Sequence, residues 1–522
     1  MRVTNQMTHN QSIGNINRNM AHLQRLYQQT TSQKVIDRPS QSPLIASRSL
    51  RLRTRAANIE QHMNNVESGH AWMNVSEASL LNLLRGQSGD DSIFVSIKDE
   101  LLRAANFGGP LDDMLIMMRN IANLTGQIGL EMNQTYAGRF VFSGWRTDQP
   151  PILNANQQGI SHVVTQTFNV SDIENTVALQ NPTTPGEPPS TVNVSILKLP
   201  YVQTGTGAND RQVMFGTPPG LGAANGQHDL QDGAGGLIAG VPTLGVFDPN
   251  GNPIPVIRVD PNAPGTFEPL PGTIHFVAET GELILAPDIA ENFEDGYTIT
   301  YQVSNLQRGD LNPLVYFDTH SEIPRVDATI PGPGNPRNFI HHWPMDNQPI
   351  SYEFAVGTNI QVNALARNIF TDKFFADLNR LVNFANELEI PDRRELEQIY
   401  GLGGQGLTGD ALETAITNHL SEANAAIRSV FQNRVNNMIG RMDSHVENAN
   451  LEHTDLGSRM RRVEMVEIRL ETDEGNFTRL LSENEDVDMT WAIIQQSIAE
   501  AAFQGALRVI ANNIQLSLTS FV

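Results

Sequence analysis

A largely apolar stretch closes the chain, from Asp488 to Val522. Glu500 and Arg508 are the two charged side chains that follow Asp488 in it. Its large apolar side chains recur at steps of three and four residues, which places them on one face of a helix. They are Phe503, Leu507, Ile510, Ile514, Leu518 and Phe521, and a second stripe contains Trp491, Ile494 and Ile498. Such a helix needs cover, from its own domain or from another copy of the chain.

A matching pattern opens the chain. Apolar positions again step by three and four residues, and the opposite face carries Asn, Gln, Arg and His. The ladder consists of Ile13, Ile16, Met20, Leu23, Tyr27 and Thr30. It predicts an amphipathic helix that ends before Pro39. A second helix is predicted to begin at Ser42-Pro43, with Ser as the N-cap and Pro at the first helical position. Its apolar stripe runs to Leu84 at near-constant 3.5-residue spacing, which favours a coiled coil.

Helical patterning continues over residues 92–136, with an interruption at 107–110, and gives way to a strand pattern at 138–148. Residues 149–345 differ: short β-rich runs at 192–197, 272–277 and 297–303 lie between breaks rich in Gly and Pro. This pattern predicts an all-β insert with room for two subdomains. After a strand pair at 350–354 and 360–363, helices are predicted from Phe374 and from Leu412 to about Thr472.

The predicted fold is therefore α+β and multidomain. Both termini form a long antiparallel helical bundle or coiled coil, and the all-β insert lies between them in sequence. We expect five segments: a terminal helix at 1–40 that is partly disordered in the monomer, helical bundle at 41–148, insert at 149–345, return strands and bundle at 346–486, and a C-terminal helix at 487–522.

Composition narrows the possible functions. The net charge of −22 argues against nucleic-acid binding, because an acidic surface repels phosphate. The chain has no cysteine, which excludes disulfides, thiol nucleophiles and Cys-ligated zinc. The N-terminus lacks the apolar core of a cleaved signal peptide, and no window is apolar enough to predict membrane insertion.

Candidate chemistry is sparse. The run Gly401 to Gly406 matches G-x-G-x-x-G, but a predicted helix precedes it where a dinucleotide-binding loop would follow a strand. His341 and His342 are adjacent, so they point apart on a strand, and no third ligand stands at metal spacing. There is no H-E-x-x-H motif. The sequence therefore predicts no enzyme, no catalytic residue, no metal ligand and no cofactor.

Both ends of the chain carry a family resemblance. The segments that carry it are 1–7, 32–35, 39–46, 138–148, 352–370, 483–488 and 503–521. They resemble the flagellin-like axial proteins of bacterial flagella and, among these, the hook–filament junction group called hook-associated protein 3. Gln33 stands where that family usually has Gly, and Gln41-Ser42 where it usually has Asp-Asp. Residues of the insert match no family in the same way.

The resemblance implies a structural protein of the extracellular flagellum, exported through the flagellar type III pathway without a cleaved signal peptide. It implies assembly through the terminal helices with flagellin, with hook-associated protein 1 and with further copies in a ring-like oligomer. It also implies an export chaperone that binds the C-terminal helix. The implied interface residues are the ladder positions Ile13, Ile16, Met20, Leu23 and Tyr27, together with Trp491, Ile494, Ile498, Phe503, Leu507, Ile510, Ile514, Leu518 and Phe521.

Two alternatives remain open at this point. One is a filament flagellin. Flagellins differ from this chain in the opening residues and in the segment at 138–148. The other is a flagellin-like protein whose insert binds a ligand or carries an enzyme.

Overall fold

The computed structural model describes residues 5–85, 92–106, 108–109, 111–182, 187–207, 209–215, 244–323, 339–344, 348–387, 393–401, 404 and 406–519. The chain divides into two compact units. The terminal unit combines residues 1–68, 352–360 and 461–522, and the central unit combines 69–351 and 361–460. Among the described residues, no helix combines the length and hydropathy that crossing a bilayer requires.

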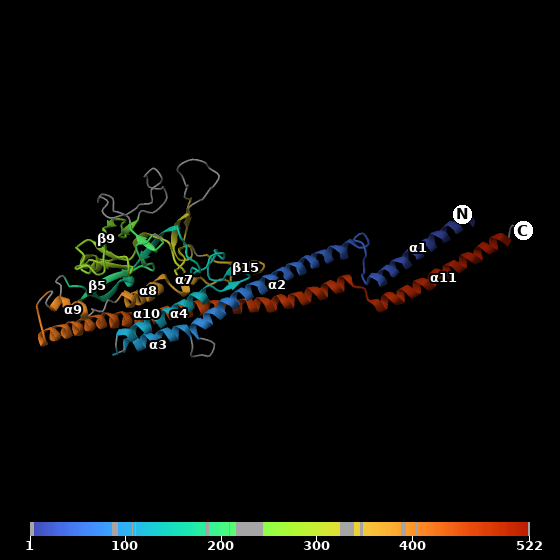
Figure 1. Cartoon of the computed structure of the whole chain (residues 1–522). Coiled ribbons are helices and arrows are strands. Elements are labelled where there is room, and N and C mark those ends of the chain that lie inside the picture. Colours follow the sequence, from blue (N-terminus) through green and yellow to red (C-terminus); the bar gives the residue numbers. More distant parts are fainter. Residues whose placement is uncertain are drawn as a thin grey trace, which may run out of the picture. The chain divides into compact units, whose positions relative to one another are not determined.

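Long helices from both ends of the sequence build the terminal unit. Helices α1 (Asn5–Ser32) and α11 (Met489–Thr519) lie side by side and run in opposite directions (Figure 1). The first part of α2 (Pro43–Leu84) contacts the last part of α10 (Asp410–Glu485), where the Arg55 guanidinium lies 5.8 Å from the centroid of the Phe477 ring. Helix α2 begins at Pro43, as the Ser-Pro signal predicts.

A β-hairpin completes the terminal unit. It consists of β15 (Ser351–Ala355) and β16 (Thr358–Gln361), close to the predicted strand pair. The carbonyl oxygen of Glu353 accepts a hydrogen bond from Asn65 Nδ2 at 2.8 Å, and His62 Nδ1 lies 3.2 Å from the same oxygen. These contacts tie the hairpin to α2.

Outside its β-rich insert, the central unit also contains α3 (Ile93–Ala105), α4 (Leu111–Met132), α7 (Ala366–Ile369), α8 (Asp372–Glu387) and α9 (Arg393–Tyr400). The Ser92 hydroxyl caps α3 by accepting from the Val95 amide at 3.1 Å. The interruption predicted at 107–110 separates α3 from α4. Two short strands follow, β1 (Thr135–Tyr136) and β2 (Arg139–Phe140), with Gly138 in the left-handed region of their turn at φ 76°.

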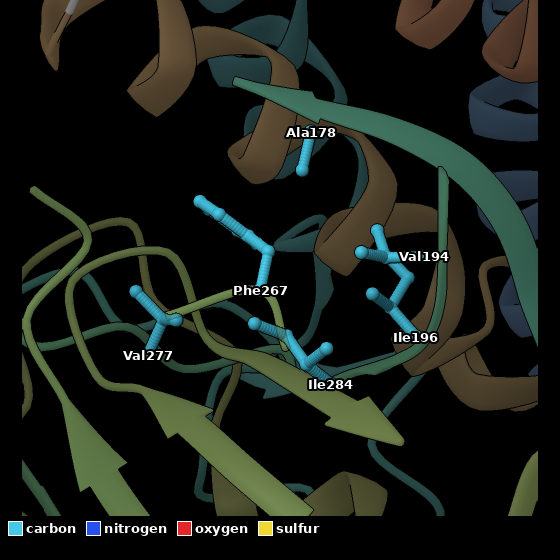
Figure 2. Packing of buried hydrophobic residues seen from close by; sticks show 6 residues of the cluster. All are labelled: Ala178, Val194, Ile196, Phe267, Val277 and Ile284. Atoms are coloured by element: carbon cyan, nitrogen blue, oxygen red, sulfur yellow. The ribbon is translucent and has the colours of Figure 1, made fainter. Parts of the chain in front are cut away.

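The central unit contains a five-stranded sheet. Its strand order is β4 (Glu174–Gln180), β5 (Ser190–Lys198), β11 (Glu282–Leu285), β10 (Ile274–Val277) and β9 (Val256–Val259). The β9–β10 pair is parallel and the other three pairs are antiparallel. Figure 2 shows apolar side chains of β4, β5, β10 and β11 gathered around Phe267 in one buried cluster. The alternation of buried positions along β4 and β5 creates this core.

A seven-stranded sheet is the second β layer of the central unit. Its order is β14 (Phe339–Trp343), β13 (Asp318–Ile323), β3 (Ser161–Phe168), β12 (Tyr297–Ser304), β7 (Gly245–Phe247) and β8 (Pro253–Ile254), and β6 (Gln212–Met214) also pairs with β12. Tyr201, three residues after β5, packs against Tyr301 on β12, with ring centroids 6.4 Å apart.

The α+β prediction with long terminal helices and central sheets is confirmed. Strands β5, β10 and β12 fall on the three predicted β runs. The description of the insert as all-β is incomplete, because it also holds α5 (Pro287–Glu291), α6 (Pro313–Tyr316) and the 3-10 turn Val170–Asp172. Both short helices begin with Pro at the first helical turn, a position where Pro favours helix initiation.

Candidate assembly surface

The seam between α1 and α11 has a regular spacing on both helices. On α11, the seam consists of buried or half-buried positions at steps of four and three residues: Ala492, Gln496, Ala499, Phe503 and Ala506. Ala492 is fully buried and Ala499 is 9% exposed. The three alanines among these positions let the two helices pack closely there.

On α1, the seam carries one large buried side chain. Leu26 is 3% exposed, and its half-buried neighbours along the seam are Ser12, Ile16, Asn19, Leu23 and Thr30. Thr30 Oγ1 donates to Gln496 Oε1 on α11 at 3.1 Å and also contacts the Leu26 carbonyl at 3.0 Å. The pairing of α1 with α11 is therefore partly polar.

This seam is offset from the ladder that hydrophobicity predicts for α1. Ile16, Leu23 and Thr30 belong to both patterns. Ile13, Met20 and Tyr27, seven residues apart, instead remain 43–46% exposed beside the seam. Leu26 takes the buried place and was missed, because Tyr27 next to it fits the three-four spacing equally well.

The predicted stripes of α11 also separate. Phe503 lies half-buried in the seam. Trp491, Ile494 and Ile498 are 52–56% exposed, and Leu507 is 45% exposed. Ile510, Ile514 and Leu518 lie in the helix but their side chains are outside the described residues, as is all of Phe521.

Over residues 491–509, helix α11 thus has three faces. One is the seam, and a second is mainly polar: it carries Ser497, Glu500, Gln504 and Arg508, with Ile493 52% exposed among them. The third, which we call the outer apolar face, carries Trp491, Ile494, Ile498 and Val509 at helical spacing, each more than half exposed. Trp491, Ile494 and Ile498 lie on adjacent helical turns, and an exposed apolar row of this kind is a candidate surface for binding another protein.

Two main-chain connections of the terminal unit, from α1 to α2 and from α10 to α11, pair with each other, and we call this contact the junction. The chain leaves α1 at Gln33, which adopts a left-handed φ of 59°, and it leaves α10 at Glu485. The two connections pair: Val35 N donates to Glu485 O at 2.7 Å, and Val487 N donates to Gln33 O at 3.0 Å. Lys34 and Asp486 form the β-bridge between these bonds.

The carboxylate of Glu485 is the centre of this junction. Arg53 donates Nε to Oε1 at 2.8 Å and Nη2 to Oε2 at 2.7 Å, and the Ser49 hydroxyl also donates to Oε1. Lys34 Nζ lies 3.4 Å from Oε2. The hydrogen bonds from Arg53, followed by those from Ser49 and Lys34, lower the pKa of Glu485 to about 2 despite its burial. Glu485 therefore stays ionised at neutral pH and holds α2 against both connections.

The chain is similar to solved structures of flagellar hook-associated proteins. One, described as a flagellar hook-associated protein from Vibrio parahaemolyticus, shares 10% identity at a TM-score of 0.35, over 85% of this chain and 100% of that one. Hook-associated protein 3 from Legionella pneumophila shares 13% identity at a TM-score of 0.28, over 83% and 97% of the two chains. FlgL from Xanthomonas campestris shares 10% identity at a TM-score of 0.27, over 83% and 99%. No protein-family model and no curated protein sequence matches the chain.

The central unit holds a buried ionic network where its five-stranded sheet meets α8 and α10. Arg380 on α8 donates to Glu174 at 2.9 Å and also pairs with Glu282. Arg441 on α10 lies 3.2 Å from Glu174 and 3.0 Å from Asp377. Lys198, Arg434, Asn437 and His445 complete the network.

Each carboxylate of this network is matched by cations. Burial raises the pKa of Glu174, but the charges of Arg380, Lys198 and Arg441 outweigh it and lower the pKa to about 2. The pKa of Asp377 is likewise lowered, against burial, mainly by Lys198. Carboxylates that stay ionised in this way can hold the sheet to the helices through ion pairs, which we call the ion-pair lock. They are poorly suited to proton transfer, because that needs a pKa near the working pH.

The glycine-rich run is placed as expected. Gly401 follows α9, and its amide donates to the Glu397 carbonyl at 2.9 Å. The Leu407 amide returns to the Tyr400 carbonyl at 2.8 Å, which closes the connection to α10. The described residues of this run therefore belong to a helix-to-helix turn, whereas a dinucleotide-binding loop would join a strand to a helix.

Proposed function

We propose that this protein is a structural axial component of the bacterial flagellum that joins the hook-associated proteins to the filament. The outer apolar face of α11 is the observation that carries the proposal. Trp491, Ile494 and Ile498 remain more than half exposed although α1 already covers the seam. The resemblance of both chain ends to flagellin-like axial proteins supports the same role.

The mechanism is assembly itself. The α1–α11 pair presents its outer apolar face to neighbouring subunits, and burial of each large side chain there contributes roughly 1.5–3 kcal/mol of association free energy. The occupants are further copies in a ring, flagellin on one side and hook-associated protein 1 on the other. We place the protein outside the cell, exported through the flagellar type III pathway without a cleaved signal peptide.

A dedicated export chaperone would cover the same face before assembly. The argument is physical: an exposed row of Trp and Ile aggregates at cellular concentrations unless a partner shields it. An amphipathic helix that inserts its apolar side into a groove is a common mode of such recognition.

The buried ion pairs of the central unit favour a non-enzymatic role for that part of the molecule. Glu174, Glu282 and Asp377 each contact at least one cation of the network, so they anchor the sheet to α8 and α10. We therefore propose that the insert is a scaffold carried on the helices, without catalysis.

Deletion of the gene tests the junction role. The proposal predicts cells that build hooks but no filaments and that release flagellin monomers into the medium, as seen by electron microscopy and immunoblotting. Normal filaments in the deletion strain would refute the proposal. A filament flagellin, the alternative of the same class, would instead leave hooks without filaments and without any flagellin in the medium, because the deleted protein is itself the filament subunit.

A further inference from the structure

We propose that Asp318, His320 and His342 form a binding site for a divalent transition-metal cation, with Zn²⁺ as the favoured occupant. One potential ligand atom from each of the three residues lies within 4.8 Å of the others. The site is in the central unit, on the seven-stranded sheet, and it is independent of the assembly role proposed above.

Strand register brings the three side chains to one face of the sheet. His320 on β13 stands directly opposite His342 on β14. Asp318 precedes His320 by two positions, so it points to the same face. The intervening Thr319 points to the other face, where it is fully buried and donates to the Pro313 carbonyl at 3.0 Å. The opposite burial of Thr319 fixes the orientation of its two neighbours.

The side chains are already close enough to share a ligand. His342 Nε2 lies 2.7 Å from Asp318 Oδ1. The imidazoles of His320 and His342 stack with ring centroids 4.3 Å apart and an interplanar angle of 19°. Two histidines and one carboxylate are a donor set that zinc accepts, with a solvent molecule in the fourth position. All-oxygen sites, which Ca²⁺ and Mg²⁺ prefer, have a different composition.

The cluster combines a fixed ligand with two adjustable ones. His320 is 8% exposed, whereas the side chains of Asp318 and His342 are 44% and 50% exposed. Tetrahedral zinc holds its ligand atoms about 3.3–3.5 Å apart, so no separation within the 4.8 Å limit has to shorten by more than about 1.5 Å. Rotation of the two exposed side chains about their χ angles supplies that movement, and their exposure provides an entry path from solvent.

A bound metal would join an edge strand to its neighbour. Strand β14 stands at the end of the sheet order and pairs with β13. A cation shared by His342 and by two β13 residues would fasten that edge. Because the cation binds the folded state, it stabilises the fold increasingly as its free concentration rises above its dissociation constant.

The first test is metal uptake by the full chain. The protein is freed of metal with a chelator and desalted, then titrated with Zn²⁺ by calorimetry and with Co²⁺ by visible absorption. Excess Mg²⁺ is present throughout, because a chain of net charge −22 binds cations weakly at many carboxylates. We expect one Zn²⁺ per chain and the intense visible absorption of tetrahedral Co²⁺.

Site variants and matched controls decide whether these residues are responsible. His342→Ala and Asp318→Asn should each lose the single site, and both change exposed side chains, so the fold should persist by circular dichroism. His22→Ala and Asp113→Asn, at exposed positions elsewhere, should keep it. Hydrogen exchange at the β14 amides should slow with Zn²⁺ in the wild type and in the two controls, but not in the site variants. Absence of one-to-one uptake in the wild type, or uptake that survives in both site variants, would overturn the proposal.

Discussion

Arg53 and Glu485 form a two-pronged ion pair, with Nε 2.8 Å from Oε1 and Nη2 2.7 Å from Oε2. Arg53 belongs to α2, and Glu485 is the last residue of α10. The main chain of Glu485 meanwhile accepts from Val35, just beyond α1. Glu485 therefore connects the end of α10 to two segments, at Val35 and at Arg53, that lie more than 400 positions earlier in the sequence. We expect the pairing of the terminal helices to depend on it.

Glu485→Gln should weaken the junction. The substitution keeps the size of the side chain but removes the charge that Arg53, Ser49 and Lys34 contact, and charged hydrogen bonds of this kind contribute about 1.5–3 kcal/mol. We expect faster proteolysis of the connections at 33–42 and 486–488, and a lower melting temperature. Glu483→Gln is the control, because Glu483 makes an exposed pair with Arg479, and its effect should stay within about 0.5 kcal/mol.

The junction should also depend on pH. Folding lowers the pKa of Glu485 to about 2, below the value of about 4.3 in an unfolded chain. The contribution to stability is therefore complete above about pH 5 and is lost as the pH falls toward 2. The difference in melting temperature between wild type and Glu485→Gln should shrink over that interval. A difference that stays constant between pH 7 and pH 3 would contradict this assignment.

Close approach of α1 and α11 predicts a strong effect at Ala492. This residue is fully buried, so Ala492→Leu overfills the seam and should cost about 1–3 kcal/mol. Hydrogen exchange of the α1 amides should accelerate as the pair opens. Ala501→Leu adds the same atoms at an exposed position of the same helix and should leave the exchange unchanged. Equal rates in the two variants would mean that the seam lies elsewhere.

The central network predicts a large cost for losing Arg380. Its side chain is 5% exposed and contacts both Glu174 and Glu282. Arg380→Met keeps much of the volume but leaves buried charge less compensated, and we expect a loss of about 3–5 kcal/mol in urea unfolding. Arg258→Met removes a more exposed pair with Glu279 and should cost less than about 1 kcal/mol. Similar losses in the two variants would show that the network is not an ion-pair lock.

Local signals in the sequence predicted much of the fold. Ser42-Pro43 marked the start of α2, and short β runs marked β5, β10 and β12. The α1–α11 seam was harder to predict, because two adjacent rows of side chains along α1 fit the same three-four spacing. One row contains Met20 and Tyr27, and the other contains Leu26. The alanines of α11 gave no signal, since a hydrophobicity ladder ranks large side chains first.

Contacts between distant strands and helices could not be predicted. His342 was considered only with its neighbour His341, but the register of β13 with β14 brings it to His320 and Asp318. Arg53 and Glu485 gave no pattern either, because their pairing depends on how α2 and α10 pack. Such pairs are fixed by tertiary structure, which no local spacing in a single sequence encodes.

The most direct test of the account is assembly by variants of the outer apolar face. In a strain that lacks the gene, Ile494→Asp/Ile498→Asp should be expressed and remain folded, since both side chains are already exposed. It should nevertheless leave hooks without filaments in electron micrographs, because two charges prevent burial of the face. Gln504→Asp, on the polar face of the same helix, should restore filaments fully. Filaments of normal number and length on cells that carry the double variant would contradict the account.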